Sequence, residues 1–355
     1  MSRFFSEKYS ELEAYVPGEQ PKDKTYIKLN TNESPFPPAP EVVAAVAKEA
    51  GTLNLYSDPE SLELTKAVAE RYGLSKDQVV MTNGSDEILY LAFLSFCDEN
   101  TPIVFPDITY GFYEVLSNLL KIPFEKIPLK DDFTIDYKDY CGINKNIVFA
   151  NPNAPTGIAL PLFEVEEIVK SNPNNIVIVD EAYIDFAKPG TSAVELINKY
   201  DNLLVTMTFS KSRSLAGARI GMGLGSRDLI LDLNTMRNSF TPYNISKLNS
   251  ISATYAIKND EYYMNNCETI KQNREYFVKG LLELGFDVLP SETNFVFTKA
   301  KFMKGEYVYE ELKREGILVR FFGTERLKSF VRITIGTKEQ MDKVLEALLK
   351  IKNKE

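Results

Sequence analysis

Short segments that are apolar throughout recur along the first 250 residues, separated by longer segments with helical periodicity. The apolar segments are found at 79–82, 102–105, 147–150, 176–180 and 203–207. A strand that is apolar on both faces belongs inside a sheet covered by helices, and such sheets are mostly parallel. The pattern therefore predicts an α/β fold with a mostly parallel sheet covered by helices. In such folds, ligands bind at the carboxyl ends of the strands.

The pattern changes after about residue 250. A long helical stretch, expected at about 255–284, is followed by strands with fewer crossovers and by a final helix at 337–351. This arrangement predicts a second, smaller α+β lobe. The expected organisation is an N-terminal arm at 1–40 that packs on the small domain and the active site, a large domain at 41–250 and a small domain at 251–355.

Composition excludes several classes of partner. The 355 residues carry a net charge of −9 without long runs of lysine or arginine, which argues against binding to nucleic acid or to an anionic membrane surface. No apolar run approaches the ~20 residues of a membrane span, and the N-terminus does not resemble a signal peptide. Cys97, Cys141 and Cys267 are an odd number of widely spaced cysteines, so we expect reduced thiols and a cytoplasmic location.

The sequence contains no histidine. This excludes catalysis by Ser-His-Asp or Cys-His groups and any metal site with histidine ligands. Because the cysteines are not paired either, we expect no metal site. An enzyme of this composition would use Lys, Tyr, Asp or Glu as its acid–base group, or would leave the chemistry to a cofactor.

One lysine has unusual neighbours. Lys211 follows the apolar segment 203–207, with Thr208 and Ser210 before it and Arg219 eight residues later. Hydroxyls and a guanidinium suit a phosphate group. Asp180 ends the preceding apolar segment. Taken singly, the lysine would be a solvated surface charge and the aspartate a loop or cap carboxylate. Together they are what pyridoxal 5′-phosphate (PLP) requires: an amine for its aldehyde, a phosphate site and a carboxylate for its ring nitrogen.

Several motifs occur in an order that resembles the fold-type I PLP-dependent aminotransferases, and within them the histidinol-phosphate aminotransferases. The resemblance covers nearly the whole chain and implies an aspartate aminotransferase-like fold. The motifs are Y-V-P-G (15–18), L-N-T-N-E-S-P-F-P-P (29–38), L-Y-S-D-P (55–59), N-G-S-D-E (83–87), P-x-x-T-Y-G-x-Y (106–113), N-P-N-A-P-T-G (151–157), V-D-E-A-Y-I-D-F (179–186), F-S-K-S-R-S-L-A-G-A-R-I-G (209–221) and V-R-I-T-I-G-T (331–337).

The resemblance implies a role for each residue of the cofactor site. Lys211 would bind the cofactor aldehyde and later move the proton, Asp180 would pair with the pyridine nitrogen, and Tyr183 would hydrogen-bond the phenolic oxygen. Tyr110 would stack on the ring. The phosphate would be bound at a helix N-terminus, where backbone N–H groups point at anions. Its expected ligands are Ser85, Asp86, Thr208, Ser210, Arg219 and, from a partner subunit, Tyr56, which makes the expected form a homodimer.

The resemblance also implies a substrate site. Arg320 and Arg332 follow valines in two apolar segments; singly, each would be a rim charge or half of a salt bridge. In the family they would bind the phosphate of histidinol phosphate and a carboxylate of glutamate or 2-oxoglutarate, with Tyr15 closing over the site. The implied reaction transfers the amino group of L-histidinol phosphate to 2-oxoglutarate, giving imidazole acetol phosphate and L-glutamate in histidine biosynthesis.

One position departs from the family pattern. Many members have an asparagine that contacts the phenolic oxygen where this chain has Ala154. Asn153 or Asn151 could take over this contact, or Tyr183 could make it alone.

Other functions fit parts of the sequence. An aromatic amino-acid transaminase and a threonine-phosphate decarboxylase would share Lys211, Asp180 and Arg219. A nicotinamide-dependent dehydrogenase could be built on G-M-G-L-G (221–225), but these glycines lie within an apparent strand rather than in a loop between strand and helix. A catalytically silent binding or regulatory module is disfavoured because the chemical positions other than Ala154 are filled.

Overall fold

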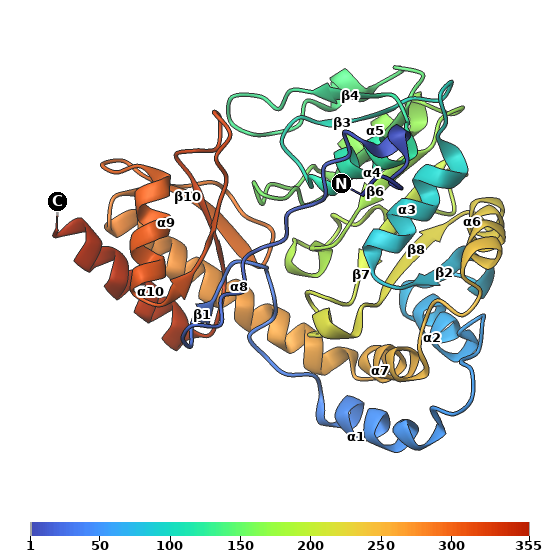
Figure 1. Ribbon diagram of the computed structural model, residues 1–355, viewed down its shortest axis with the longest axis horizontal. Helices are drawn as coiled ribbons and strands as arrows, with labels where there is room; N and C mark the ends of the chain where they lie inside the picture. Colours follow the sequence, from blue (N-terminus) through green and yellow to red (C-terminus); the bar gives the residue numbers. More distant parts are fainter. Residues whose placement is uncertain (1, 355) are drawn as a thin grey trace.

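The largest sheet fills one side of the molecule. The structure is a computed structural model that describes residues 2–354 (Figure 1). The strands of this sheet are β2 (Val79–Thr82), β3 (Ile103–Pro106), β4 (Phe124–Ile127), β5 (Asn146–Ala150), β6 (Val177–Asp180), β7 (Leu203–Thr208) and β8 (Gly221–Gly225). They lie in the order β2-β8-β7-β6-β5-β3-β4. Strand β8 runs antiparallel to both β2 and β7, and the other neighbouring pairs are parallel. The prediction of a mostly parallel sheet is confirmed.

Helices cover both faces of this sheet. They are α1 (Pro40–Glu49), α2 (Leu62–Tyr72), α3 (Ser85–Phe96), α4 (Phe112–Leu120), α5 (Leu162–Ser171), α6 (Arg227–Phe240) and α7 (Lys247–Lys258). Neighbouring residues of a strand point to opposite faces. In β6, Val177 and Val179 pack in the same core as α1, α2, α5 and α7, whereas Ile178 packs in the core that contains α3, α4 and α6. This explains why the strand is apolar at every position.

A smaller lobe has its own sheet and its own core. Its antiparallel sheet consists of β9 (Phe286–Val288), β10 (Phe295–Ala300), β12 (Arg320–Phe321) and β13 (Val331–Thr334), in the order β12-β13-β10-β9. Its helices are α8 (Asp260–Glu283), α9 (Gly305–Arg314) and α10 (Lys338–Lys352), and they share a second hydrophobic core with the sheet.

The N-terminal segment joins the two lobes. Strand β1 (Ile27–Lys28) pairs in parallel with β11 (Ile317–Leu318) of the small lobe. The chain continues through residues 29–34 along the small lobe, where Leu29 packs in the core, before α1 starts on the large sheet. This path brings residues 30–33 to the wall of a cavity between the lobes.

The helical stretch expected at 255–284 is two helices rather than one. Helix α7 ends at Lys258 and α8 begins at Asp260. Asn259 between them has φ −103° and ψ 37°, and its side-chain amide donates to the carbonyl of Tyr255. A side chain that satisfies a carbonyl of the last turn is a common way to end a helix. The predicted division at residue 250 stays a prediction; it falls within α7, which contacts α1 and α2.

An ion pair between a buried arginine and a half-buried aspartate connects the start of α8 to the loop that carries Lys211. The guanidinium of Arg213 lies 2.5 Å from a carboxylate oxygen of Asp260, and only 2 % of Arg213 is exposed. Arg71, in the last turn of α2, pairs with the other carboxylate oxygen at 2.9 Å. The first residue of α8 is thereby attached both to α2 and to the loop after β7. None of the helices in residues 2–354 combines the length and apolar character of a membrane span.

Candidate active site

A cavity of about 610 Å³ lies where several strands of the large sheet end, between that sheet, the N-terminal segment and the small lobe. It collects side chains that are far apart in the sequence. Of the residues predicted for the site, those that line it are Tyr15, Ser85, Asp86, Tyr110, Asp180, Tyr183, Thr208, Ser210, Lys211, Arg219, Arg320 and Arg332. Two predicted residues, Asn153 and Tyr56, do not line it.

Lys211 lies in the loop after β7, and its amine faces the N-terminal segment. Nζ donates a hydrogen bond of 3.0 Å to the carbonyl of Thr31. Burial lowers the pKa of this amine to about 8, and the positive charge of Arg332 acts in the same direction. Burial lowers the pKa of lysine because the charged form loses its solvation. A substantial fraction of the amine is therefore neutral near pH 8, which is the form that can act as a nucleophile or a base.

Asp180 is the last residue of β6 and is almost fully buried, with 3 % exposed. The hydroxyl of Tyr113 donates to Oδ2 at 2.9 Å, whereas Oδ1 has no hydrogen-bond partner within residues 2–354. Burial raises the pKa of this carboxyl to about 6, and the hydrogen bond from Tyr113 opposes the rise. A buried carboxylate with an unused oxygen is costly unless a cationic group meets it.

An anion site is formed where α3 begins. Gly84 precedes the helix with φ 82° and lies beside the guanidinium of Arg219, and Ser85 and Asp86 in the first turn of α3 line the cavity. Arg219 donates to Asp86 Oδ2 at 3.2 Å and to Ser210 Oγ at 3.3 Å, and the hydroxyl of Thr208 lies 3.0 Å from that of Ser210. A helix N-terminus, a guanidinium and hydroxyls are the groups that bind a phosphate.

The glycine run 221–225 is strand β8, as its sequence position indicated, and does not form a nucleotide loop. A side chain at Gly221 would place its Cβ 2.3 Å from the carbonyl carbon of Gly84. Glycine at this position therefore allows the start of α3 to approach the sheet closely. The dehydrogenase interpretation depended on a dinucleotide-binding loop at 221–225, and this segment is a strand instead.

Two tyrosines close one side of the cavity. Tyr110 donates its hydroxyl to Asp86 Oδ1 at 3.0 Å, and the ring of Tyr15 meets the ring of Tyr110 edge-on at 5.9 Å. Burial raises the pKa of the Tyr15 hydroxyl, although Arg320 and Arg332 oppose the rise. Both hydroxyls therefore stay protonated at neutral pH and can donate hydrogen bonds.

Arg320 and Arg332 lie directly opposite each other on β12 and β13. Like charges in this position repel. Arg332 donates to the carbonyl of Asn30 at 3.0 Å, while its Nε is buried without a partner in the described part of the chain. Arg320 donates to the carbonyls of Val16 and Pro17 at 3.2 Å, so it joins the N-terminal arm to the small lobe. The pair creates a strongly positive wall that suits an anion.

Asn153 and Tyr56 lie away from the cavity lining. The amide of Asn153 is buried and donates to Ile108 and Thr156, while its oxygen accepts from Thr109, so it supports the loop behind the cavity. Asn151 donates to Leu160 in a similar way. Within residues 2–354, the side-chain amides of both asparagines are engaged in these hydrogen bonds. Tyr56 is 82 % exposed and stacks on Tyr243.

Two contacts of the site were not predicted from the sequence. Tyr113 binds Asp180, and Asn32 donates its amide to the hydroxyl of Tyr183 at 2.9 Å. Asn32 also has the positive φ of 57° that asparagine tolerates better than most residues. The available signal for Tyr113 was its place at the end of the P-x-x-T-Y-G-x-Y motif (106–113), which also contains Tyr110.

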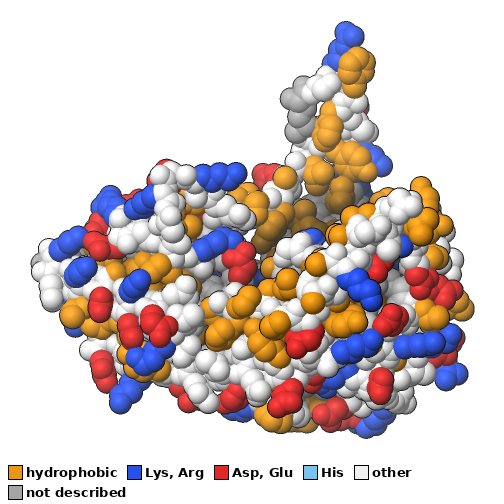
Figure 2. Space-filling view, turned by 90° about the horizontal axis from the view of Figure 1, so that it is seen from below, with side chains coloured by type: hydrophobic (Ala, Val, Ile, Leu, Met, Phe, Trp, Pro, Cys, Tyr) orange, Lys and Arg blue, Asp and Glu red, His pale blue; other side chains and the backbone are white. Residues whose placement is uncertain are grey.

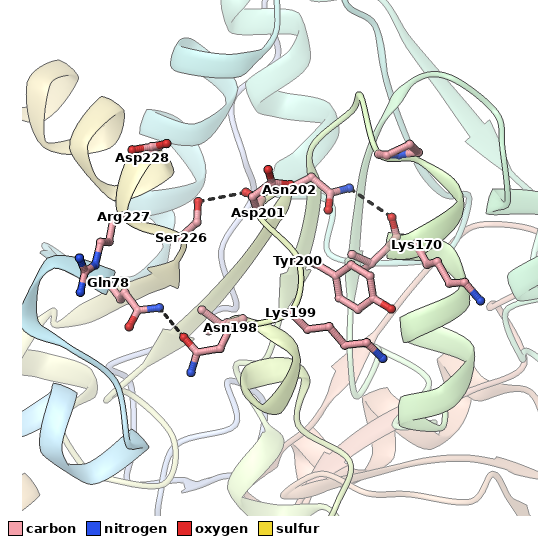
Figure 3. A pocket seen from close by; sticks show the side chains of 13 residues that line it. Gln78, Lys170, Asn198, Lys199, Tyr200, Asp201, Asn202, Ser226, Arg227 and Asp228 are labelled. Atoms are coloured by element: carbon pink, nitrogen blue, oxygen red, sulfur yellow. Dashed lines mark hydrogen bonds between the residues drawn. The ribbon is translucent and has the colours of Figure 1, made fainter.

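A second depression lies near the starts of β2 and β7, the end of β8 and the start of α6 (Figure 3). Its polar side chains are already occupied: Gln78 donates to Asn198, Ser226 to the carbonyl of Asp201, and Asn202 to backbone carbonyls. Lys199 and Arg227 form ion pairs with carboxylates. Within residues 2–354, no cluster of His, Cys, Asp or Glu could hold a metal ion.

Comparison with known proteins identifies related sequences over nearly the full chain. The family described as "Aminotransferase class I and II" matches residues 24–348. A histidinol-phosphate aminotransferase of Brachyspira hyodysenteriae is 48% identical over 349 residues, which cover 98% of each chain. One from Marinomonas sp. is 49% identical over 352 residues, covering 98% of this chain and 99% of the other.

Solved structures share the fold. The histidinol-phosphate aminotransferase of Sinorhizobium meliloti, crystallised in complex with pyridoxal-5′-phosphate, has a TM-score of 0.87 and 25% identity, covering 93% of this chain and 92% of that chain. Aspartate aminotransferase from Thermotoga maritima has a TM-score of 0.80 and 23% identity, with 92% of each chain covered.

Proposed function

The chain belongs to the class I and II aminotransferase family, and from this premise we propose that it is a PLP-dependent enzyme that transfers the amino group of L-histidinol phosphate to 2-oxoglutarate. The observation that carries the proposal is the presence, in one cavity, of the Lys211 amine, the Asp180 carboxylate and the opposed guanidinium groups of Arg320 and Arg332. The first two suit the cofactor, and the arginine pair suits an anionic substrate.

The cavity residues fit PLP. The unpartnered Oδ1 of Asp180 leaves acceptor capacity for a protonated ring nitrogen, and the partly neutral amine of Lys211 suits an aldehyde. The start of α3, with Arg219 and Ser210, suits the phosphate. Tyr183 receives a hydrogen bond from Asn32, and its own hydroxyl proton is free to be donated to the phenolic oxygen. The substitution at Ala154 therefore leaves this contact to Tyr183.

When bound, PLP supplies an aldehyde that accepts amines and a ring that withdraws electrons from the substrate Cα. The protein supplies the proton transfers and the electrostatic environment. Asp180 keeps the ring nitrogen protonated, since an ionised carboxylate stabilises the cation beside it. The Lys211 amine would act as the base that accepts the proton of the substrate Cα and as the acid that gives it back. Burial lowers the pKa of this amine to about 8, which enlarges the neutral fraction that can accept a proton.

The substrate anion is bound by the small lobe. Histidinol phosphate carries a phosphate and glutamate carries carboxylates, so one site accepts both kinds of anion in turn. A planar guanidinium forms paired hydrogen bonds with either. We assign this shared contact to Arg332, whose buried Nε has no partner in the described chain. Arg320 donates to the N-terminal arm, and Tyr15 belongs to that arm. We assign both residues mainly to the phosphate of histidinol phosphate.

The proposal is tested by comparing substrates on the purified holoenzyme. We expect kcat/KM with 2-oxoglutarate as acceptor to be highest for histidinol phosphate, above that for phenylalanine or tyrosine. We expect threonine phosphate to release no CO₂. A higher kcat/KM for an aromatic amino acid, or CO₂ release from threonine phosphate, would identify the enzyme as one of the alternatives on the same scaffold.

We further propose that the working unit is a homodimer in which Tyr56 reaches the phosphate site of the partner. Tyr56 and Tyr243 stack at 4.7 Å, although 82 % and 50 % of these residues are exposed. Figure 2 shows the N-terminal segment projecting from the body with apolar side chains on its surface; Phe4 is 81 % and Val16 is 71 % exposed. Exposed apolar groups of this kind mark interfaces, and a twofold interface is the commonest arrangement.

Complementation tests the composite site. Tyr56→Ala and Lys211→Ala should each lower activity, because each removes one component of every site. Refolding the two variants together should restore activity that neither has alone, since a mixed dimer has one site with both residues intact. Phe163→Ala, which removes another exposed aromatic ring from α5, is the control and should behave like wild type. Failure of the mixture to gain activity would contradict the model.

Two further assignments remain proposals. Among the described residues, all three cysteines are free, which is compatible with a reducing cytoplasm. The division into an arm at 1–40, a large domain at 41–250 and a small domain at 251–355 also stays a proposal, and its boundary at residue 250 falls within α7.

A further inference from the structure

Tyr113 is a fully buried tyrosine that contacts the site without lining the cavity. It lies in the first turn of α4, and its exposed fraction is 0 %. Its hydroxyl donates to Asp180 Oδ2 at 2.9 Å. Its ring meets the ring of Tyr110 at 5.7 Å and 85°, and Tyr110 does line the cavity. One short segment thus places a ring at the cavity wall and a hydroxyl on the carboxylate behind it.

The position of the Tyr113 ring is fixed by packing. It lies in the core between the sheet and α3 and α4, with the ring of Phe105 at 6.0 Å. The hydroxyl of Ser117 donates to the backbone carbonyl of Tyr113, one turn along α4. A close-packed core holds side chains in single rotamers. The hydroxyl of Tyr113 is therefore presented to Asp180 by a rigid support.

The surroundings of Asp180 make this hydrogen bond important. Within residues 2–354, Asp180 forms no ion pair, and the carboxylate of Asp86 acts on it with the same sign of charge. Burial raises the pKa of Asp180 to about 6; among side chains, the hydrogen bond from Tyr113 is the largest influence that lowers it. Burial and the charge of Asp180 raise the pKa of the Tyr113 hydroxyl well above its usual value, so the donor remains protonated throughout the neutral range.

We propose that Tyr113 is a positioning residue for the transamination: its hydroxyl fixes the orientation of the Asp180 carboxylate toward the cofactor nitrogen and keeps that carboxylate ionised. Tyr113 touches neither substrate nor cofactor and acts through Asp180. The proposal rests on the proposed function only through the identity of the cofactor. It is tested without any substrate, so a chain that did not transaminate histidinol phosphate would leave the test unaffected.

The experiment measures equilibrium binding of PLP in the Lys211→Ala background, where no covalent bond forms and Lys211 does not titrate. Three proteins are compared: the single variant Lys211→Ala, the double variant Lys211→Ala with Tyr113→Phe, and the double variant Lys211→Ala with Tyr140→Phe. Tyr140 is a matched control, because it is 1 % exposed in the same lobe and its hydroxyl has no hydrogen-bond partner in the described chain. Binding is followed by absorbance from pH 5 to pH 9, and thermal unfolding of the proteins without cofactor reports the integrity of the fold.

Loss of the hydrogen bond should weaken PLP binding about tenfold near pH 7. The pH dependence provides a second readout. Protonation of Asp180 removes its attraction for the ring nitrogen, so affinity falls as pH decreases through the pKa of Asp180. Without Tyr113 this pKa is higher, so the fall should begin at a higher pH, whereas Tyr140→Phe should leave both affinity and midpoint unchanged. The cofactor's own titrations are common to all three proteins.

Three results would overturn the proposal. The first is an unchanged affinity and midpoint in Tyr113→Phe. The second is an equal change in Tyr140→Phe. The third is a lower unfolding temperature in Tyr113→Phe with unchanged PLP binding, which would show that the tyrosine serves only the core.

Discussion

Replacement of Lys211 by alanine should reduce transamination by at least about 10³-fold while the protein still binds PLP. This variant keeps the groups expected to bind the cofactor's phosphate, and it keeps Asp180 and the ring contacts. We therefore expect the cofactor to bind noncovalently. The variant lacks the amine that accepts and returns the Cα proton, and general acid–base catalysis typically contributes about 10²–10⁴-fold. The absence of the covalent attachment adds to this effect. Single-turnover kinetics of each half-reaction would measure the change.

The visible absorption band of the lysine-bound cofactor gives a second measurement. We expect it to be absent from Lys211→Ala and present in Lys170→Ala, which removes a lysine from the second depression and should retain wild-type activity. Retention of substantial transamination in Lys211→Ala would contradict the assignment of Lys211 as the proton-transferring residue.

Replacement of Arg332 by alanine should impair both half-reactions, by roughly 30-fold to several thousand-fold in kcat/KM. Removing a charge-assisted hydrogen bond from a site shielded from water costs about 2–5 kcal/mol. Arg332 lies beside Asn30 and is stacked over the rings of Phe295 and Phe322 at 5.1 and 5.7 Å, so its position is well defined before any anion arrives. The same guanidinium is expected to bind the phosphate of one substrate and a carboxylate of the other.

Neighbouring variants separate the shared contact from the phosphate-specific ones. Steady-state constants should be measured for histidinol phosphate and for glutamate separately. Tyr15→Phe should weaken chiefly the histidinol phosphate half-reaction, because it removes a hydroxyl near the phosphate end and leaves Arg332 in place. If Arg332→Ala left the glutamate kinetics intact, the shared-arginine model would be wrong and the carboxylate would bind elsewhere.

Five strands of the large sheet could be predicted from the sequence because they are mostly apolar and fully buried, as strands covered on both faces must be. Strand β4 carries the exposed Glu125 and Lys126 and was not predicted. Lys211 and Asp180 could be located for a related reason. Each follows or ends such a strand, and the carboxyl ends of parallel strands meet at one edge of a sheet. Their chemical roles came from the resemblance to a family rather than from this geometry, and they stay predictions until variants are measured.

Other features depend on contacts between distant segments, which local patterns do not encode. From the sequence alone, Tyr113 would be interpreted as an ordinary core tyrosine. Only the placement of α4 against the end of β6 reveals its hydrogen bond to Asp180. Asn32 and Tyr183 are 151 positions apart, yet they share a hydrogen bond. Asn153 has the residue type expected at a cofactor, but the loop directs its amide to Ile108 and Thr156. The break at Asn259 depends on a single side chain and interrupts an otherwise continuous helical pattern.

The ion pair between Arg213 and Asp260 attaches one end of α8 to the large lobe, while the other end packs in the small lobe. Helix α8 has 24 residues, so it is about 36 Å long. Its near end is joined to α2 and to the loop of Lys211, and Tyr263 in its first turn belongs to the large core. Its far end, with Phe277 and Leu281, belongs to the small core (Figure 1). A rotation of about 5° around the attached end would move the other end by roughly 3 Å, given this length. A rotation this small about the end that is attached two residues from Lys211 would therefore displace the part of α8 that packs in the small core by a distance comparable to a hydrogen bond.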